Sequence, residues 1–230
     1  GIEHIEMSPG YRWQRPLQLR KLLRVLRPDV VVAFQEAPSV YAEVASLVGR
    51  TWGLIVSERI ADPGSTKGLY GVIRLMHHVA DIVTANSHAN AEVIRSVWGC
   101  GKIPVSVVYN GVDLEYFKPR RAVRTEESDG DSLAIVVLAS HQKKKNFANV
   151  LLALEIVLQS TPAHLTWYGR HCSDNTSLEE GKELLLDRGL GNYVTLSPPT
   201  PDAREAYWAS DCVLLASWYE GCPNVICEAM

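Results

Sequence analysis

Residues 133–139 read LAIVVLA, a continuous apolar run of strand length. Such a run indicates a strand that is buried on both faces of a sheet. The same alternation of short apolar runs and longer amphipathic segments continues to the end of the chain. It predicts further strands at 165–168, 194–196 and 212–216, and helices at 147–159, 178–188, 203–209 and from about Pro223. Apolar strands that alternate with helices predict a parallel sheet with helices on both faces.

The first half of the chain shows the same alternation. We expect strands at 30–34, 53–56, 82–85 and 105–109, and helices at 40–48, 68–79 and 88–98. Residues 119–132 read PRRAVRTEESDGDS, which is polar and typical of a linker. We therefore expect an α/β domain at 1–118, a linker at 119–131 and a second α/β domain at 132–230.

Both ends of the chain lack the signals that usually open or close such a domain. No strand with a Gly-rich turn precedes residue 30, and residues 226–230 form helical sequence without a stop signal. We expect both domains to be incomplete and the chain to be an internal fragment of a longer protein.

Composition excludes several classes of protein. The 230 residues carry a net charge of -3, whereas a sequence-independent nucleic-acid binder needs a basic excess. Five scattered cysteines favour a reducing, cytoplasmic location, and their spacing does not predict a zinc site. No apolar run reaches the roughly 18 residues that a membrane-spanning helix needs.

Residues 217–230 read SWYEGCPNVICEAM and follow an apolar strand. Pro223 is suited to a helix start, and Gly221 allows a ligand to approach the backbone closely. Glu228 shares a helix face with Asn224, and Glu220 lies in the preceding loop. A helix end with two carboxylates suits a nucleotide-sugar, with diphosphate on the amides and hydroxyl groups on the acids. The alternative is that both acids only complement the helix dipole or face solvent.

Glu220 and Glu228, spaced E-x7-E, resemble the signature of the retaining glycosyltransferases of family four, which have the GT-B fold. Other segments resemble that family in the same order. They are NGVD at 110–113 with Phe117 and Pro119, GLGNYVTL at 189–196, and ASD at 209–211. SER at 57–59 with Asp62 and Pro63 resembles a subgroup of polysaccharide and lipid-linked glycan assembly. The resemblance implies two Rossmann-like domains that face a cleft.

The resemblance also implies roles for individual residues. Glu220 would contact the donor hexose near the reacting centre, and Glu228 would hold the ribose. The loop Gly221, Cys222, Pro223, Asn224 and Val225 would contact the diphosphate and the hexose.

The family binds the donor phosphates with an arginine and a lysine five residues apart. Here Lys145 stands at the lysine position, but Ser140 stands at the arginine position. Lys143 and Lys144 are candidates to compensate, and the alternative for this run is a solvated basic turn.

Candidates on the acceptor side lie in the first half. Glu58, as a catalytic candidate, and Arg59 follow a strand, where they could contact the acceptor or the reacting hexose; the alternative is a surface ion pair. Asn110 could line the cleft, or Asn110-Gly111 could simply be a turn. His77 and His78 are adjacent and cannot both face one metal, so we expect a core or surface role.

These observations predict a retaining transferase that moves a hexosyl unit from a UDP- or GDP-sugar to a glycan or lipid-linked acceptor, with no metal and no cofactor. The alternatives are a sugar-nucleotide 2-epimerase and a non-catalytic GT-B-like binding protein. Four basic residues, Arg20, Lys21, Arg24 and Arg27, alternate with leucines in a segment that could lie on a membrane surface or cover the sheet.

Overall fold

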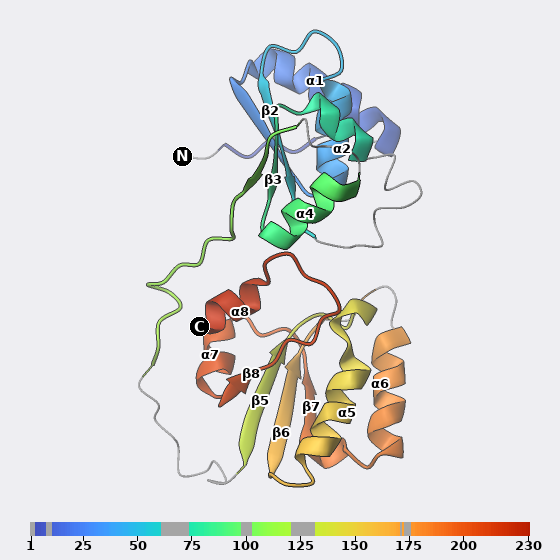
Figure 1. Cartoon of the computed structure of the whole chain (residues 1–230), viewed down its shortest axis with the longest axis vertical. Coiled ribbons are helices and arrows are strands. Elements are labelled where there is room, and N and C mark those ends of the chain that lie inside the picture. The colour runs from blue at the N-terminus through green and yellow to red at the C-terminus, as the bar shows by residue number, and fades with distance from the viewer. Residues whose placement is uncertain are drawn as a thin grey trace. The chain divides into compact units, whose positions relative to one another are not determined.

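The computed structural model describes residues 3–7, 11–60, 74–97, 103–120, 132–170, 172 and 176–230. They form two compact units (Figure 1). The first unit comprises Gly1–Asn110 together with Tyr219–Cys222, and the second comprises Gly111–Trp218 together with Pro223–Met230. The expected linker lies almost entirely outside the described residues, as do Asp62 and Pro63.

The first unit is built on a four-stranded parallel sheet in the order β1-β2-β3-β4. Helices α1, α2 and α4 lie on one side of this sheet (Figure 1). The strands are β1 (Val30–Phe34), β2 (Gly53–Glu58), β3 (Ile82–Ala85) and β4 (Val105–Val107), and the helices are η1 (Arg12–Gln14), α1 (Arg15–Leu26), α2 (Glu36–Ala45), η3 (Met76–Val79) and α4 (His88–Val97).

The second unit is built on a parallel sheet in the order β7-β6-β5-β8. Helices α5 and α6 lie on one side of it, and α7 and α8 lie on the other (Figure 1). The strands are β5 (Leu133–Leu138), β6 (Ala163–Tyr168), β7 (Val194–Ser197) and β8 (Cys212–Val213), and the helices are η5 (Lys143–Lys145), α5 (Phe147–Val157), α6 (Thr176–Asp187), η6 (Gly191–Tyr193), α7 (Ala203–Trp208) and α8 (Asn224–Ala229).

Every strand that the sequence predicts is present, and the prediction of two parallel-sheet α/β domains is confirmed. Helix α2 begins four residues earlier than predicted, because Pro38 is tolerated in a first turn, where its missing N–H has no helical partner. Part of the helix predicted at 68–79 lies outside the described residues, and its end is the 3-10 turn η3. Pro223 precedes helix α8 as its N-cap rather than forming its first residue.

The core of the second unit is packed around two aromatic rings that are fully buried. Phe147 and Trp167 meet edge to face, with ring centroids 4.7 Å apart. Gly181 of α6 lies directly against the Phe147 ring, since a Cβ atom at this position would come within 2.2 Å of it. The glycine therefore allows α6 to pack closely against α5.

We expect Gly181→Ala to destabilise the chain by about 1–3 kcal/mol, because the added methyl group overpacks the core. In an exposed helix the same change would stabilise by up to about 1 kcal/mol. Gly191→Ala is the matched control, because nothing lies within 4 Å of the Cβ position there. Urea denaturation measures both variants, and equal stability of the two would contradict the packing account.

Candidate functional site

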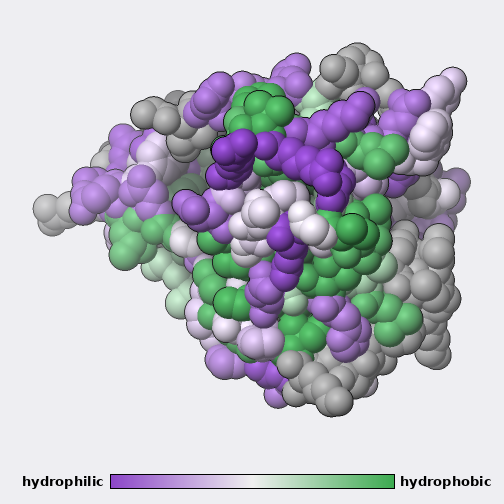
Figure 2. All heavy atoms as spheres, turned by 90° about the horizontal axis from the view of Figure 1, so that it is seen from above, coloured by the Kyte–Doolittle hydropathy of each residue, from purple (hydrophilic) through white to green (hydrophobic). Residues whose placement is uncertain are grey.

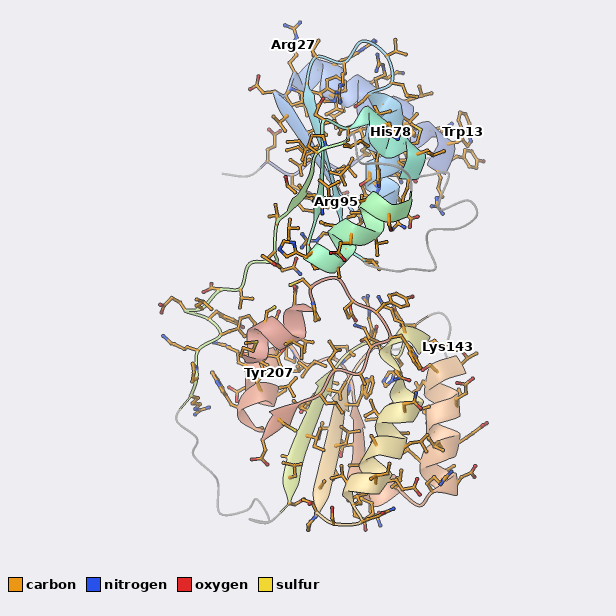
Figure 3. The ribbon with its side chains drawn as sticks, viewed as in Figure 1. Trp13, Arg27, His78, Arg95, Lys143 and Tyr207 are labelled. Atoms are coloured by element: carbon orange, nitrogen blue, oxygen red, sulfur yellow. The ribbon has the colours of Figure 1, made fainter. Side chains whose placement is uncertain are left out.

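The carboxyl ends of β5 and β8 lie side by side in the second sheet and carry most of the expected donor-binding residues. The loop after β5 forms the turn η5, which contains Lys145 and the labelled Lys143 (Figure 3). The Lys144 carbonyl accepts a hydrogen bond of 2.9 Å from the backbone N–H of Trp218. This bond joins the lysine turn to the loop that leads to Glu220.

Helix α8 carries Asn224, Val225 and Glu228, with Pro223 as its N-cap. The hydroxyl of Tyr207 in α7 donates a hydrogen bond of 2.9 Å to Glu228 Oε2. Burial, followed by this hydrogen bond and the charge of Glu228, raises the pKa of Tyr207 well above its usual range. Tyr207 therefore stays protonated and orients the carboxylate. Tyr207 is labelled in Figure 3. The sequence did not predict its role, because no motif connects Tyr207 with Glu228, which lies 21 positions away.

Glu220, Gly221 and Cys222 belong to the first compact unit. Within that unit, Asn110 Nδ2 donates a hydrogen bond of 2.8 Å to the Cys222 carbonyl. A Cβ atom on Gly221 would come within 2.3 Å of Asn86 Oδ1. Glycine is therefore required at this position by close packing against Asn86, whereas the predicted close approach of a ligand to Gly221 stays a prediction.

Arg59 and Asn110 lie at the carboxyl ends of strands in the first sheet and contact each other. The Arg59 guanidinium donates a hydrogen bond to Asn110 Oδ1 and lies 5.7 Å from the centroid of the Phe34 ring. Asn110 is thus engaged through both its amide oxygen and its amide nitrogen. It does more than supply a turn residue before Gly111.

Glu58 forms a buried ion-pair network rather than a surface ion pair with Arg59. We call Glu43, Glu58, Arg74 and His77 the buried acid–base cluster; each is at most 7% exposed. His77 Nδ1 lies 2.6 Å from Glu43 Oε1, and His77 Nε2 lies 3.0 Å from Glu58 Oε1. Arg74 contacts the other oxygen of Glu58 at 3.4 Å.

The cluster shifts the pKa values of its members in opposite directions. Burial acts to lower the pKa of His77, but the hydrogen bonds to Glu43 and Glu58 outweigh burial and raise it to about 9. Burial acts to raise the pKa of Glu58, but the bond to His77 and the charge of Arg74 lower it overall. Burial raises the pKa of Glu43. His77 is therefore an imidazolium at neutral pH.

Glu43 is the residue from which this cluster could have been predicted. It is an acid on the helix face that also carries the buried residues Ser39 and Ala42. A buried carboxylate needs a partner, so its position predicts one. Of the two adjacent histidines, His77 is in the core and His78 is exposed.

Among residues whose placement is described, no group of three His, Cys, Asp or Glu side chains is arranged to hold a metal ion. None of the described helices has both the length and the hydropathy for crossing a membrane.

Two family models match successive parts of the chain. Glycosyltransferase Family 4 matches residues 4–116, and Glycosyl transferases group 1 matches residues 132–230. Between them the two models match nearly the whole chain, which supports a glycosyltransferase of the family 4 type. The comparison with curated protein sequences found no match.

Several solved structures share the fold of this chain at low sequence identity. The HepE protein of Anabaena, crystallised with UDP and glucose, is 20% identical with a TM-score of 0.79, and the match covers 93% of this chain and 60% of that one. A sucrose-phosphate synthase of Thermosynechococcus elongatus is 14% identical with a TM-score of 0.76, and the match covers 93% of this chain and 56% of that one. An α,α-trehalose-phosphate synthase of Burkholderia vietnamiensis is 10% identical with a TM-score of 0.77, and the match covers 95% of this chain and 58% of that one.

These matches confirm the predicted GT-B fold. The chain spans about 60% of the length of the solved glycosyltransferases that it matches. The roles of Glu220, Glu228, Lys145 and the other site residues stay predictions.

The buried acid–base cluster makes the stability of the chain depend on pH. Because the pKa of His77 is raised by folding, its contribution is complete below about pH 6.5 and is lost as pH rises through about 9. We expect a loss of roughly 3 kcal/mol when the histidine is fully deprotonated. Urea denaturation between pH 6 and 10 should show this loss in the wild-type chain and not in His77→Gln. Parallel pH profiles for the two proteins would contradict the assignment.

Proposed function

We propose that this chain is part of a retaining glycosyltransferase that transfers a hexosyl unit from a UDP- or GDP-sugar to a glycan or lipid-linked acceptor. The hydrogen bond between Tyr207 and Glu228 is the observation that carries the proposal. It fixes a carboxylate on the helix that follows β8, and open α/β folds bind ligands beyond the carboxyl ends of their strands. A fixed carboxylate is suited to accept hydrogen bonds from the ribose hydroxyl groups of the donor.

The lysine turn η5 supplies positive charge beside the same loop. As the glycosidic bond to the diphosphate breaks, the leaving nucleoside diphosphate gains negative charge. Lys145 stabilises that charge in the proposal, and a charged hydrogen bond of this kind contributes roughly 1.5–3 kcal/mol. Lys143 and Lys144 provide further cationic groups in the same turn, shortly after Ser140, where the family carries an arginine. With these cations the transfer needs no metal ion.

The remaining candidates take the roles that the resemblance implies. Glu220 contacts the hexose at the reacting centre, and the loop formed by residues 221–225 contacts the diphosphate and the hexose. Arg59 and Asn110 act on the acceptor side. Glu58 has both carboxylate oxygens engaged by His77 and Arg74, which favours an indirect role over contact with substrate.

Variants of the carboxylate and its partner test donor binding. We expect Glu228→Ala to weaken UDP or GDP binding at least about tenfold, and Tyr207→Phe to weaken it about threefold to tenfold, because one hydrogen bond is lost. Ligand-observed NMR with the full-length protein measures both. Glu180→Ala, an exposed acid on α6, is the control. Wild-type binding by Glu228→Ala, or no binding of either nucleotide to the wild type, would contradict the proposal.

Product analysis with UDP- and GDP-sugars and a panel of glycan and lipid-linked acceptors distinguishes the alternatives. Transfer to an acceptor with retained anomeric configuration supports the proposal. An epimerised sugar without acceptor glycosylation would identify a 2-epimerase. Donor binding without any turnover would identify a binding protein.

We further propose that the first unit contacts the inner membrane face, where a lipid-linked acceptor would lie. The segment 11–27 contains basic residues and no acids. Tyr11, Trp13 and Leu17 on it are 59–73% exposed, and the Trp13 ring points away from the helices (Figure 3). Figure 2 shows hydrophilic and apolar residues interspersed over the face of the molecule that is seen from above. Exposed aromatics beside basic residues are typical of segments that lie on anionic membranes. Arg20 instead binds the carbonyls of Ala45 and Val48 and anchors α1 within the unit.

Vesicle sedimentation tests this contact. We expect binding to vesicles that contain phosphatidylglycerol, weaker binding at high salt, and little binding to phosphatidylcholine alone. Trp13→Ala should reduce binding several-fold, since its ring adds apolar area. Leu186→Ala, which changes a still more exposed apolar residue of the second unit, should not reduce it. Equal binding to both vesicle types, or equal effects of the two variants, would contradict the proposal.

A further inference from the structure

The buried acid–base cluster connects three separate segments of the first unit. Glu43 lies in the last turn of α2, Glu58 is the last residue of β2, and His77 lies in η3. His77 contacts a carboxylate through each of its ring nitrogens, at 2.6 and 3.0 Å. Its side chain is 2% exposed, so water does not screen these contacts.

The geometry selects the protonated form of the histidine. A neutral imidazole has one N–H donor and one nitrogen lone pair, whereas an imidazolium donates from both nitrogens. With both nitrogens beside carboxylate oxygens, deprotonation would place a lone pair against an acceptor. The protonated state therefore holds α2 and η3 against the end of β2.

The charges around His77 come from each of these elements. Glu43 faces it from α2 and Glu58 faces it from β2, while Arg74 precedes η3 and pairs with Glu58. Glu36 stands at the start of α2, and burial and the nearby Glu58 charge raise its pKa. His78 is exposed. With both cations and the two carboxylates charged, the cluster is neutral.

A second set of hydrogen bonds holds the backbone where β2 ends. The side-chain amide of Asn90 in α4 donates to the Glu58 carbonyl at 3.0 Å, and that of Asn86 donates to the Arg59 carbonyl at 3.0 Å. Asn90 is fully buried. The end of β2 is therefore held through the Glu58 carboxylate on one side and through two carbonyls on the other. The Arg59 guanidinium extends from this point to Asn110.

We propose that His77 is a positioning residue for the acceptor side, which as an imidazolium fixes the end of β2 and thereby the orientation of Arg59. Glu58 acts in the same way, through its place in the cluster rather than by contact with substrate. Deprotonation of His77 loosens the Glu58 carboxylate, and Arg59 loses its fixed position. The inference rests on the proposed function only in assigning Arg59 to the acceptor.

A titration of the 15N-labelled chain by NMR between pH 6 and 10.5 tests the positioning directly. We expect the Arg59 Nε–H and the Asn90 side-chain amide to shift with the same midpoint as the His77 ring. His77→Gln should abolish that transition, and His78→Gln should leave it unchanged. A transition that persists in His77→Gln would overturn the proposal. So would Arg59 and Asn90 resonances that shift with a midpoint different from that of the His77 ring.

Glu43→Gln provides a second test that keeps the size of the side chain. Removal of one negative charge should lower the His77 midpoint by about 1 unit or more, and the Arg59 and Asn90 transitions should move with it. If the His77 midpoint moves and the other two stay, Arg59 is not positioned by the cluster and the proposal fails.

The transfer assay then separates this role from a purely structural one. We expect Glu43→Gln to raise the acceptor KM at least about fivefold at pH 8, with the affinity for UDP or GDP changed less than about twofold. Equal losses for donor and acceptor would indicate general destabilisation and would overturn the positioning role. Absence of transfer by the wild type would instead count against the proposed function, and the NMR titration would still decide the role of His77.

Discussion

Parallel strand pairing places the carboxyl ends of all strands at one edge of each sheet, and the location of the candidate residues depends on this constraint. In the second sheet, Leu138 of β5 pairs with Tyr168 of β6, and β8 pairs with β5 on the other side. The turns that follow these strands therefore carry the lysines and the loop toward Glu220. In the first sheet the same rule places Glu58 opposite Ala85, directly before Asn86.

Each unit adds polar contacts that hold these strand ends in place. Tyr207 orients the Glu228 carboxylate in the second unit. In the first unit a buried histidine, paired with two acids, holds the end of β2. Buried charges cost stability unless they are paired and hydrogen-bonded. The pairing of His77 with both acids meets this requirement inside the first unit. In both units a hydrogen bond to a second side chain holds a carboxylate in one orientation.

The sequence was sufficient for the strands and for the GT-B fold, but not for contacts between distant residues. Continuous apolar runs such as 133–139 predict buried parallel strands from local pattern alone. The pairing of Glu43 with His77, 34 positions apart, depends on how α2 and η3 pack, which no local pattern specifies. In the sequence Gly181 likewise resembles an ordinary helix interruption. Only the structure shows that it packs against the Phe147 ring. Helix starts were also misplaced where Pro38 lies within a first turn.

A crystal structure of the protein with UDP bound is the most direct measurement of the central claim, that a carboxylate held by Tyr207 receives the nucleoside of the donor. The account predicts that a ribose hydroxyl lies within hydrogen-bonding distance of Glu228, with the Tyr207 bond intact, and that the diphosphate lies beside Lys145. A nucleotide bound elsewhere on the protein, with Glu228 paired to Tyr207 alone, would contradict it.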